Sequence, residues 1–276
     1  ATQAAGETPA NIEQDDECIE IMTGAALPSS ADTVIRYEDV QTDNLQATIT
    51  IDMAGITKGL NIHARGRDKK QHEVVATPNR VITPALISMA ASVGKEYIVV
   101  KKLPRVVIIS SGDEVVHISE TPTPFQIRRS NNYTIKSALL QYSLPADMLH
   151  IPDNAAITKE QITNCLELYD VLILSGGVSM GKFDYIPQAL EDCSVQKRFH
   201  NVQQRPGKPF WFGKHANGLL VFAFPGNPVS TFMCLHRYFF PWLEHSLGIE
   251  QQKQYAVLAE DYVFTPALQY FLQVKL

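Results

Sequence analysis

The chain has 276 residues, of which 45% are hydrophobic and 19% charged, a composition typical of a globular protein with room for more than one domain. Its net charge of -5 argues against a basic surface for nucleic acid, and its longest apolar runs, such as LLVFAF at 219–224, are too short to cross a bilayer. We therefore expect neither a nucleic-acid nor a membrane partner.

The four cysteines form no CxxC pair and show no metal-ligand spacing with the eight histidines. Free thiols in a reducing compartment are the simplest interpretation, so we expect a cytoplasmic protein. The chain begins without Met and ends on a strand-like run, LQYFLQVKL. We therefore expect it to be a piece of a longer protein.

The first part of the chain is expected to be rich in β-strands, because short runs of β-forming residues separated by turn residues lie at 18–22, 32–40 and 45–52. The next segment is predicted to contain one helix. Thr83 is suited to be its N-cap, Pro84 to be its first residue and Gly94 to end it.

The run EYIVVKKLP at 96–104 predicts a return to strand, with a boundary at Pro104. From residue 105 strands and helices alternate. Strands are predicted at 105–114, 146–151, 170–177 and 218–228, and helices at 130–143, 158–168, 184–193 and 229–248.

These strands are nearly continuous apolar runs, which is typical of a parallel sheet covered on both faces. We predict a doubly wound, mostly parallel α/β domain. It would follow a small β-rich domain and a short helix-containing segment, and precede the start of a C-terminal β domain. The expected domain boundaries are 1–65, 66–103, 104–248 and 249–276.

In such sheets ligands bind beyond the carboxyl ends of the strands. Four polar or glycine-rich segments follow strands and can therefore converge on one edge; they lie at 110–114, 150–154, 175–184 and 224–230. Glycines at 176, 177 and 181, and the Gly226–Asn227 pair before a helix, would let backbone amides approach a phosphate or similar oxyanion. The alternative is that these glycines only make tight strand-to-helix turns.

Acidic residues gather in the same segments: Asp113, Glu114, Asp153 and Asp184. Carboxylates beside a phosphate site suit a bridging divalent metal, since hard cations take oxygen ligands. Each acid also has a simpler explanation. Asp184 could cap the following helix, and Asp153 could belong to an Asx-turn.

Two further motifs are weaker indicators. GVSMG matches the nucleophile elbow of α/β hydrolases, but two glycines separate Ser179 from the strand and no glycine-rich oxyanion loop precedes it. In the first part of the chain Thr23 lies on a turn. Asp68 lies among four basic residues, which suits an anion site, although surface ion pairing is the commoner explanation.

Seven motifs in order resemble those of the MoeA-type molybdopterin molybdenumtransferases, a family that includes the enzymatic domain of gephyrin. They are IEIMTGAALPSSADTVIRYEDV, NIHARGRD, PRVVIISSGDEVV, QIRRSNNYTI, LILSGGVSMGKFDY, RPGKPFWFG and FAFPGNPVS. The resemblance implies the last step of molybdenum cofactor synthesis. Molybdate enters adenylylated molybdopterin and AMP is released, with the help of a divalent cation such as Mg²⁺.

The resemblance also assigns roles to individual residues. Glu114, Asp153 and Asp184 match the functional acids and would bind the metal, and Thr23 and Asp68 match functional positions in the preceding domain. The expected substrate-binding residues are Ser111, Gly112, Gly176, Gly177, Ser179, Gly181, Arg205, Lys208, Pro225, Gly226 and Asn227.

Three positions depart from the family pattern. Arg205 stands where the family often has lysine, Asn201 where some members have a second functional lysine, and Arg129 where many carry aspartate. We therefore expect anion handling to differ around Arg205 and Asn201, and specificity to differ at Arg129. Family members are dimers whose cleft joins two chains, so a homodimer is expected, and a molybdopterin adenylyltransferase is a further candidate partner.

Two other functions stay open at this point. A molybdopterin adenylyltransferase shares the α/β domain and its glycine loop, but that family lacks the β region that precedes it here. A catalytically inactive scaffold or paralogue is the other alternative, because gephyrin also clusters receptors.

Overall fold

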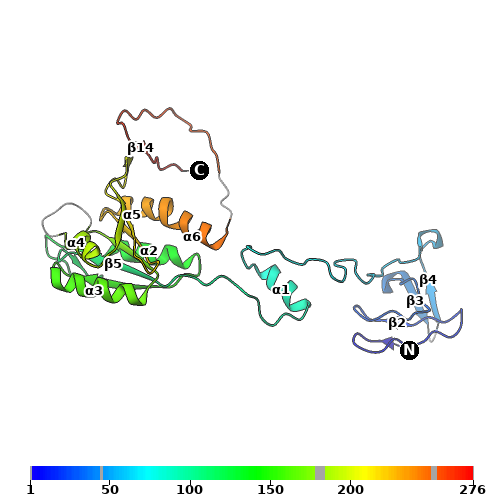
Figure 1. The fold of residues 1–276 in the computed structure, drawn as a ribbon. Helices are drawn as coiled ribbons and strands as arrows, with labels where there is room; N and C mark the ends of the chain where they lie inside the picture. The colour runs from blue at the N-terminus through cyan, green and yellow to red at the C-terminus, as the bar shows by residue number, and fades with distance from the viewer. Residues whose placement is uncertain (1, 44–45, 178–183, 250–253, 276) are drawn as a thin grey trace. The chain divides into compact units, whose positions relative to one another are not determined.

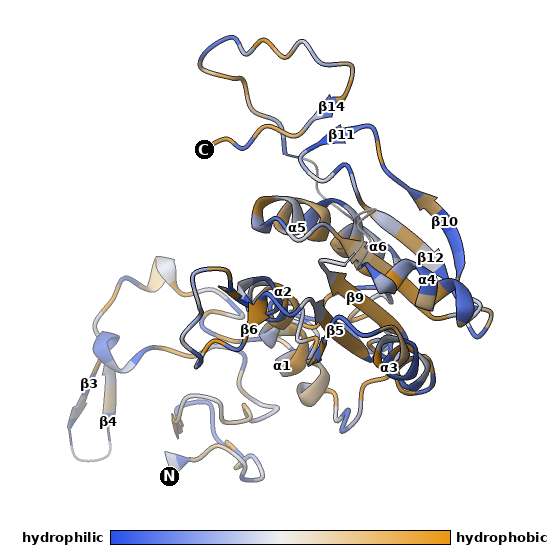
Figure 2. Cartoon of the chain, turned by 90° about the vertical axis from the view of Figure 1, so that its left-hand side faces the viewer, coloured by the Kyte–Doolittle hydropathy of each residue, from blue (hydrophilic) through white to orange (hydrophobic). Residues whose placement is uncertain are grey.

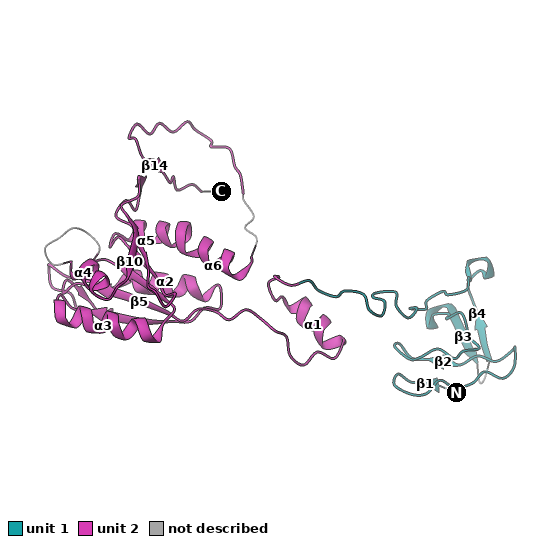
Figure 3. Ribbon diagram, in the orientation of Figure 1, with its two compact units in different colours: residues 1–77 teal, residues 78–276 magenta. Residues whose placement is uncertain are grey.

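The computed structural model describes residues 2–43, 46–177, 184–249 and 254–275. The chain divides into two compact units, residues 1–77 and 78–276 (Figure 3). The finer division into four domains stays a prediction. No described helix is both long and apolar enough to span a membrane.

Unit 1 contains less strand than the sequence predicts. Its elements are the parallel pair β1 (Thr2–Gln3) and β2 (Glu20–Ile21), the antiparallel pair β3 (Val40–Asp43) and β4 (Gln46–Ile49), and the 3₁₀ helices η1 (Tyr37–Asp39) and η2 (Met53–Gly55). The prediction of a strand along 32–40 was therefore wrong except at its last residue. β-forming residues become a strand only where a neighbouring strand accepts their hydrogen bonds.

Helix α1 (Pro84–Ser92) begins and ends where the sequence predicts. The Thr83 hydroxyl oxygen accepts a hydrogen bond from the Leu86 amide at 3.2 Å, and Gly94 follows with a φ of 73°. The strand predicted at 96–104 is absent from the described structure, and Val99 there is fully exposed. That prediction was wrong for the same reason, because an apolar run without a pairing partner stays irregular.

A six-stranded sheet with the order β10-β12-β13-β9-β5-β8 forms the centre of unit 2. Four of its strands are parallel: β5 (Val106–Ser111), β8 (Ala146–Ile151), β9 (Val171–Ser175) and β13 (Leu220–Phe224). All four were predicted. The antiparallel strands β12 (Trp211–Lys214) and β10 (Gln196–His200) were not predicted; β10 is the edge strand, and β12 lies between it and β13. β10 lacks an apolar run, and four of its five residues are exposed.

Helices cover both faces of this sheet (Figure 1). One face carries α2 (Ser130–Leu140), α5 (Pro228–Cys234), the π-helix η3 (Leu235–Phe239) and α6 (Phe240–Leu247), and the other carries α3 (Ala155–Leu168) and α4 (Tyr185–Asp192). The sequence predicted one helix over 229–248. The structure inserts the π-helical turn just before Pro241, which lacks the amide hydrogen that a regular helix would need there.

The core follows the alternation of side chains along each strand. Ile108, Ile173 and Phe222 pack into the cluster under α2, α5 and α6. Their neighbours Ile109 and Leu174 pack into the second cluster, under α3 and α4. Figure 2 shows β5 and β9 as hydrophobic along their length. The predicted α/β fold class is therefore confirmed.

Two pairs of short parallel strands complete unit 2. β6 (Val115–Val116) pairs with β7 (Ile127–Arg128), and β11 (Gln204–Arg205) pairs with β14 (Gln269–Tyr270). In the described part of the expected C-terminal β region, β14 is the strand that forms.

Candidate active site

The loops that follow β5, β8, β9 and β13 meet at the carboxyl edge of the sheet. The Gly112 amide donates to the Ile151 carbonyl at 3.3 Å, which joins the ends of β5 and β8. A Cβ on Gly177 would lie 2.3 Å from the Ser111 hydroxyl oxygen, and one on Gly226 would lie 3.6 Å from the Cα of Gly176. The four predicted segments therefore do converge.

Two of the predicted acids bind each other's loops. The Asp113 amide donates to the Asp153 carboxylate at 3.4 Å, and the Asp153 amide donates to the Asp113 carboxylate at 3.2 Å. Both carboxylates are thus held at the ends of β5 and β8. This reciprocal pairing, rather than a local Asx-turn, is what orders Asp153.

Glu114 lies over the turn that follows β5. A Cβ on Gly112 would lie only 2.2 Å from the Glu114 carboxylate oxygen Oε2, and the Gly112 φ of 110° is unfavourable for other residues. Glycine at position 112 therefore lets the Glu114 carboxylate fold back against the backbone at this edge.

Asn131 was missed by the sequence reasoning, yet it ties three elements together. Its Nδ2 donates to the Ser175 hydroxyl oxygen and to the Gly226 carbonyl, both at 2.8 Å. The start of α2 is thereby attached to the ends of β9 and β13. A polar residue in the motif SNN was the only sequence signal, because its partners lie 44 and 95 residues away.

His150 and Ser110 were also not singled out by the sequence. His150 Nδ1 and the buried Ser110 hydroxyl oxygen are 3.1 Å apart, across β5 and β8. Burial lowers the pKa of His150, and the positive charge of Arg129 lowers it further, while Asp113 and Glu114 act in the opposite direction. The edge therefore favours a neutral imidazole.

The glycine loop after β9 is described only at its beginning. Gly176 and Gly177 have φ values of 92° and 67°, so the turn itself requires glycine. Ser179 and Gly181 lie outside the described residues. Asp184 occupies the N-cap position of α4, but its side chain makes no capping hydrogen bond, so helix capping does not explain this acid.

The loop after β13 uses its side chains for its own structure. The Asn227 side-chain oxygen accepts from the amides of Val229 and Ser230 and so caps α5. The Pro225 carbonyl accepts from the Thr231 hydroxyl at 2.7 Å. Gly226 and Asn227 are exposed, so the loop can offer its backbone to a ligand.

Arg205 and Lys208 lie on a separate segment that packs against α5. A Cβ on Gly207 would lie 2.7 Å from Cys234 Sγ, and both basic side chains are exposed. Among the described residues no hydrogen bond or ion pair joins this segment to the glycine loops. Asn201 has a φ of 65°, a left-handed conformation that asparagine tolerates better than lysine.

Unit 1 holds Thr23 and Asp68. Thr23 is exposed within a turn closed by the Ala25 amide and the Met22 carbonyl at 3.0 Å. Asp68 pairs with His63 at 3.0 Å, and 84% of its side chain is exposed. Asp68 is thus bonded to His63 at the surface, and its catalytic role stays a prediction.

The donor set at the carboxyl edge suits Mg²⁺ in kind, because carboxylate oxygens are its preferred protein ligands. Within the described ranges, however, no three His, Cys, Asp or Glu side chains are arranged to hold a metal ion. Glu114, Asp153 and Asp184 therefore do not form a ready-made metal cage by themselves. Mg²⁺ commonly completes such sites with substrate phosphates.

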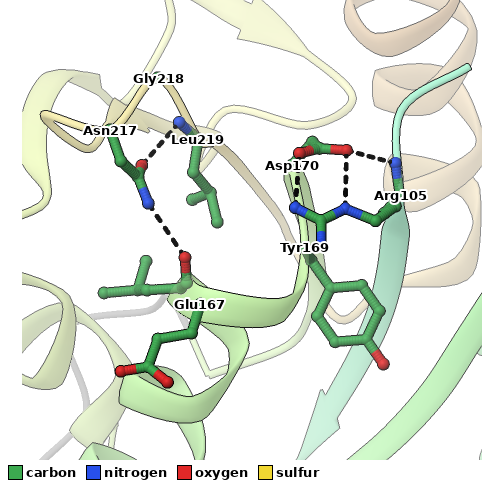
Figure 4. Close-up of a pocket in the computed structure, with 8 residues that line it drawn as sticks. Arg105, Glu167, Tyr169, Asp170, Asn217, Gly218 and Leu219 are labelled. Carbon is green, nitrogen blue, oxygen red and sulfur yellow. Dashed lines mark hydrogen bonds and ion pairs between the residues drawn. The ribbon is translucent and has the colours of Figure 1, made fainter. Parts of the chain in front are cut away.

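A pocket of about 280 Å³ lies at the opposite edge of the sheet, where β5, β9 and β13 begin (Figure 4). Asp170 accepts from the Arg105 backbone amide at 2.8 Å and from its guanidinium at 2.9 Å, and Asn217 donates to the Leu166 carbonyl at 3.0 Å. These polar groups bond to one another. The pocket is therefore part of the framework rather than a second candidate site.

Both parts of the chain match known protein families. The family described as "Probable molybdopterin binding domain" matches residues 107–245, and the "MoeA N-terminal region (domain I and II)" matches residues 1–94. A molybdopterin molybdenumtransferase of Synechocystis sp. is 36% identical over the whole chain, which covers 68% of that protein. One of Staphylococcus aureus is 30% identical over 98% of the chain, which covers 65% of it.

The structure of a molybdopterin biosynthesis MoeA protein from Pyrococcus horikoshii superposes with a TM-score of 0.72 at 27% identity, covering 90% of this chain and 61% of that one. The chain thus spans about two thirds of the length of its relatives. Both parts of the chain match the same kind of protein in the same order. The chain therefore belongs to the MoeA family of molybdenum cofactor biosynthesis proteins, the molybdopterin molybdenumtransferases.

Proposed function

We propose that the protein inserts molybdate into adenylylated molybdopterin and releases AMP. The observation that carries the proposal is the contact among three side-chain-poor loops at the carboxyl edge, beside the paired Asp113 and Asp153. A bulky phosphorylated nucleotide needs close backbone approach, and acids beside it suit a bridging cation.

In this proposal the chain's residues bind and orient the substrate. The backbone of Gly176–Gly177 and Gly226–Asn227, with Ser111, Gly112, Ser179, Gly181 and Pro225, would hold the nucleotide and its pyrophosphate. Glu114, Asp153 and Asp184 would hold Mg²⁺ together with substrate oxygens. The cation supplies stabilisation of the negative charge that develops as the phosphoanhydride breaks.

Four residues outside the edge complete the proposed site. Arg205 and Lys208 are exposed cations that can attract an anionic substrate. Thr23 and Asp68 would act from the preceding domain of a second chain in a homodimer. We further propose a cytoplasmic location, which the four free cysteines support, and transfer of the nucleotide from a molybdopterin adenylyltransferase.

The test is molybdate-dependent release of AMP from adenylylated molybdopterin in the presence of Mg²⁺. It should be run on a version extended to the length of the relatives, because this chain covers about two thirds of them. Asp184→Asn should reduce release at least tenfold. Asp192→Asn, at the other end of the same helix, is the control and should retain activity.

Tight nucleotide binding without any AMP release by the unaltered protein would count against the transferase and favour an inactive scaffold. The shared cleft has its own test. Mixing inactive Thr23→Ala and Glu114→Ala chains should restore up to about a quarter of the activity if each cleft uses both chains. Absence of any restoration in a verified mixed dimer would contradict the shared site.

A further inference from the structure

Arg129 is held firmly at the carboxyl edge of the sheet. Its backbone amide donates to the Val116 carbonyl at 3.0 Å, and the nearby Ile127 amide donates to the Glu114 carbonyl at 2.8 Å. The next helix, α2, starts at Ser130 with Arg129 as its N-cap residue. Asn131, two residues on, is bonded to the loops after β9 and β13. Arg129 thus lies where the candidate site's loops meet.

The guanidinium of Arg129 has an unsatisfied donor. Its Nε is shielded from solvent, yet it has no hydrogen-bond partner. Across the described ranges, no carboxylate comes within ion-pair distance of Arg129, although Asp113 and Glu114 belong to the loop that it is bonded to. Buried donors are nearly always satisfied in native proteins, so this one needs a partner that the described residues do not supply.

The charge of Arg129 also influences His150, which lies at this edge. His150 lies close enough for the charge of Arg129 to lower the pKa of the imidazole. Arg129 is bonded through its backbone to Val116, on the segment that follows β5, and its Nε is shielded from solvent. Two acids of this edge, Asp113 and Asp153, accept hydrogen bonds from each other's backbone amides.

We propose that Arg129 binds a tetrahedral oxyanion at this edge, either a phosphate group of the nucleotide or molybdate. The proposal deepens the proposed function and rests on it for the identity of the anion. A guanidinium presents a planar fork of donors that bonds two oxygens of one oxyanion at once, which an ammonium group cannot do. Arg129 would thus act as a specificity-determining residue of this chain.

The test is binding of each anion alone, measured by isothermal titration calorimetry on the full chain at constant ionic strength. The probes are sodium molybdate and AMP, each titrated into the unaltered chain, Arg129→Gln and Arg129→Lys. Arg198→Gln removes the same charge from the exposed strand β10 at the other side of the sheet and is the matched control. Near-ultraviolet circular dichroism verifies that each variant is folded.

Arg129→Gln should bind one of the two anions at least tenfold more weakly than the unaltered chain, and the affected probe identifies the source of the oxyanion. Arg129→Lys should lose less affinity for that anion, because lysine keeps the positive charge but lacks the planar pair of guanidinium donors. Arg198→Gln should stay within twofold of the unaltered chain. A purely structural role would lower the stability of Arg129→Gln and leave both affinities unchanged.

The proposal is overturned if Arg129→Gln binds both molybdate and AMP within twofold of the unaltered chain. It is also overturned if the unaltered chain binds neither anion at millimolar concentration. Because the readout is binding and not turnover, it is independent of the AMP-release assay. A protein that releases no AMP but loses anion binding in Arg129→Gln would refute the proposed reaction and retain the oxyanion site.

Discussion

At Gly177, both the backbone conformation and the close packing around it require glycine. Its φ of 67° favours glycine, and a Cβ would meet both the Ser111 hydroxyl and the Ile186 side chain, at 2.3 and 3.0 Å. The glycine loop therefore presses against the end of β5. A turn alone would need only the positive φ, so the contact is the additional feature that builds the site.

Gly177→Ala should lower the free energy of unfolding by about 2–5 kcal/mol, combining strained backbone with overpacking. Gly218→Ala is the control, because Gly218 has a φ of 100° but open space around it. It should cost only about 1–2 kcal/mol for the backbone. Urea unfolding measures both. Equal losses in the two variants would mean that the packing against Ser111 is unimportant.

Asn131 holds the loops after β9 and β13 together at the carboxyl edge, through its hydrogen bonds to Ser175 and Gly226. In Asn131→Asp a carboxylate oxygen would face the Gly226 carbonyl in place of a donor, so stability should fall by about 1–3 kcal/mol. AMP release by the extended protein should fall as well, because the loops after β9 and β13 would separate.

Asn217→Asp gives the matched comparison, since Asn217 donates to the Leu166 carbonyl at the opposite edge. It should lose similar stability by chemical denaturation and retain AMP release after correction for folded protein. If both variants lost activity equally, the role assigned to Asn131 at the carboxyl edge would be refuted.

The strands of the sheet are also joined at their starts. Asp170, just before β9, accepts from the backbone amide and the guanidinium of Arg105, just before β5. The Arg105 guanidinium hydrogen bond, partly offset by burial, holds the pKa of Asp170 below its ordinary value. This clamp sets the register of the two strands from the side away from the candidate site.

Because the pKa of Asp170 is lower in the folded than in the unfolded state, its contribution is present above the unfolded value near 4 and is lost as pH falls through the folded value. The side chain is 42% exposed, so screening limits the contribution to about 1 kcal/mol. The stability difference between the unaltered chain and Asp170→Asn should therefore shrink as pH falls from about 5 through the lowered folded-state pKa of Asp170.

Urea unfolding at a series of pH values measures this difference. Glu167→Gln, in the same pocket, is the control and should change stability by less than about 0.5 kcal/mol. A difference between the unaltered chain and Asp170→Asn that stays constant with pH would show that the clamp does not depend on the charge of Asp170.

At the scale of the whole molecule, the buried hydrophobic side chains that the structure describes all lie between Val106 and Leu243. They form two clusters, one on each face of the sheet. Helix α1 buries no residue. Since apolar burial is the main favourable term in folding, the stability of this chain should reside in the α/β domain.

A fragment of residues 101–249 should therefore unfold in urea at the same midpoint as the full chain, within about 0.3 M, when both are followed by Trp fluorescence. Both tryptophans, Trp211 and Trp242, lie in this fragment. A clearly lower midpoint for the fragment would show that residues outside 101–249, such as β14, which pairs with β11, stabilise the α/β domain.

The sequence by itself determined the architecture of the α/β domain. Apolar runs of strand length and helical patterns between them are local signals, and they predicted β5, β8, β9, β13 and most helices. The same kind of signal, Thr83 at the start and Gly94 at the end, predicted α1 before this domain. The rule that ligands bind beyond the carboxyl ends then located the candidate site's four loops.

Only the tertiary structure decided which side chains meet at that edge and which strands find partners. The bonds of Asn131 and His150 reach residues 40 or more positions away. The Nε of Arg129 is shielded from solvent by other parts of the fold. No local sequence pattern encodes either kind of contact. The run at 96–104 reads as a strand and stays irregular, whereas polar β10 pairs with β12. A strand exists only through its neighbour, so its formation depends on the whole fold rather than on its own residues.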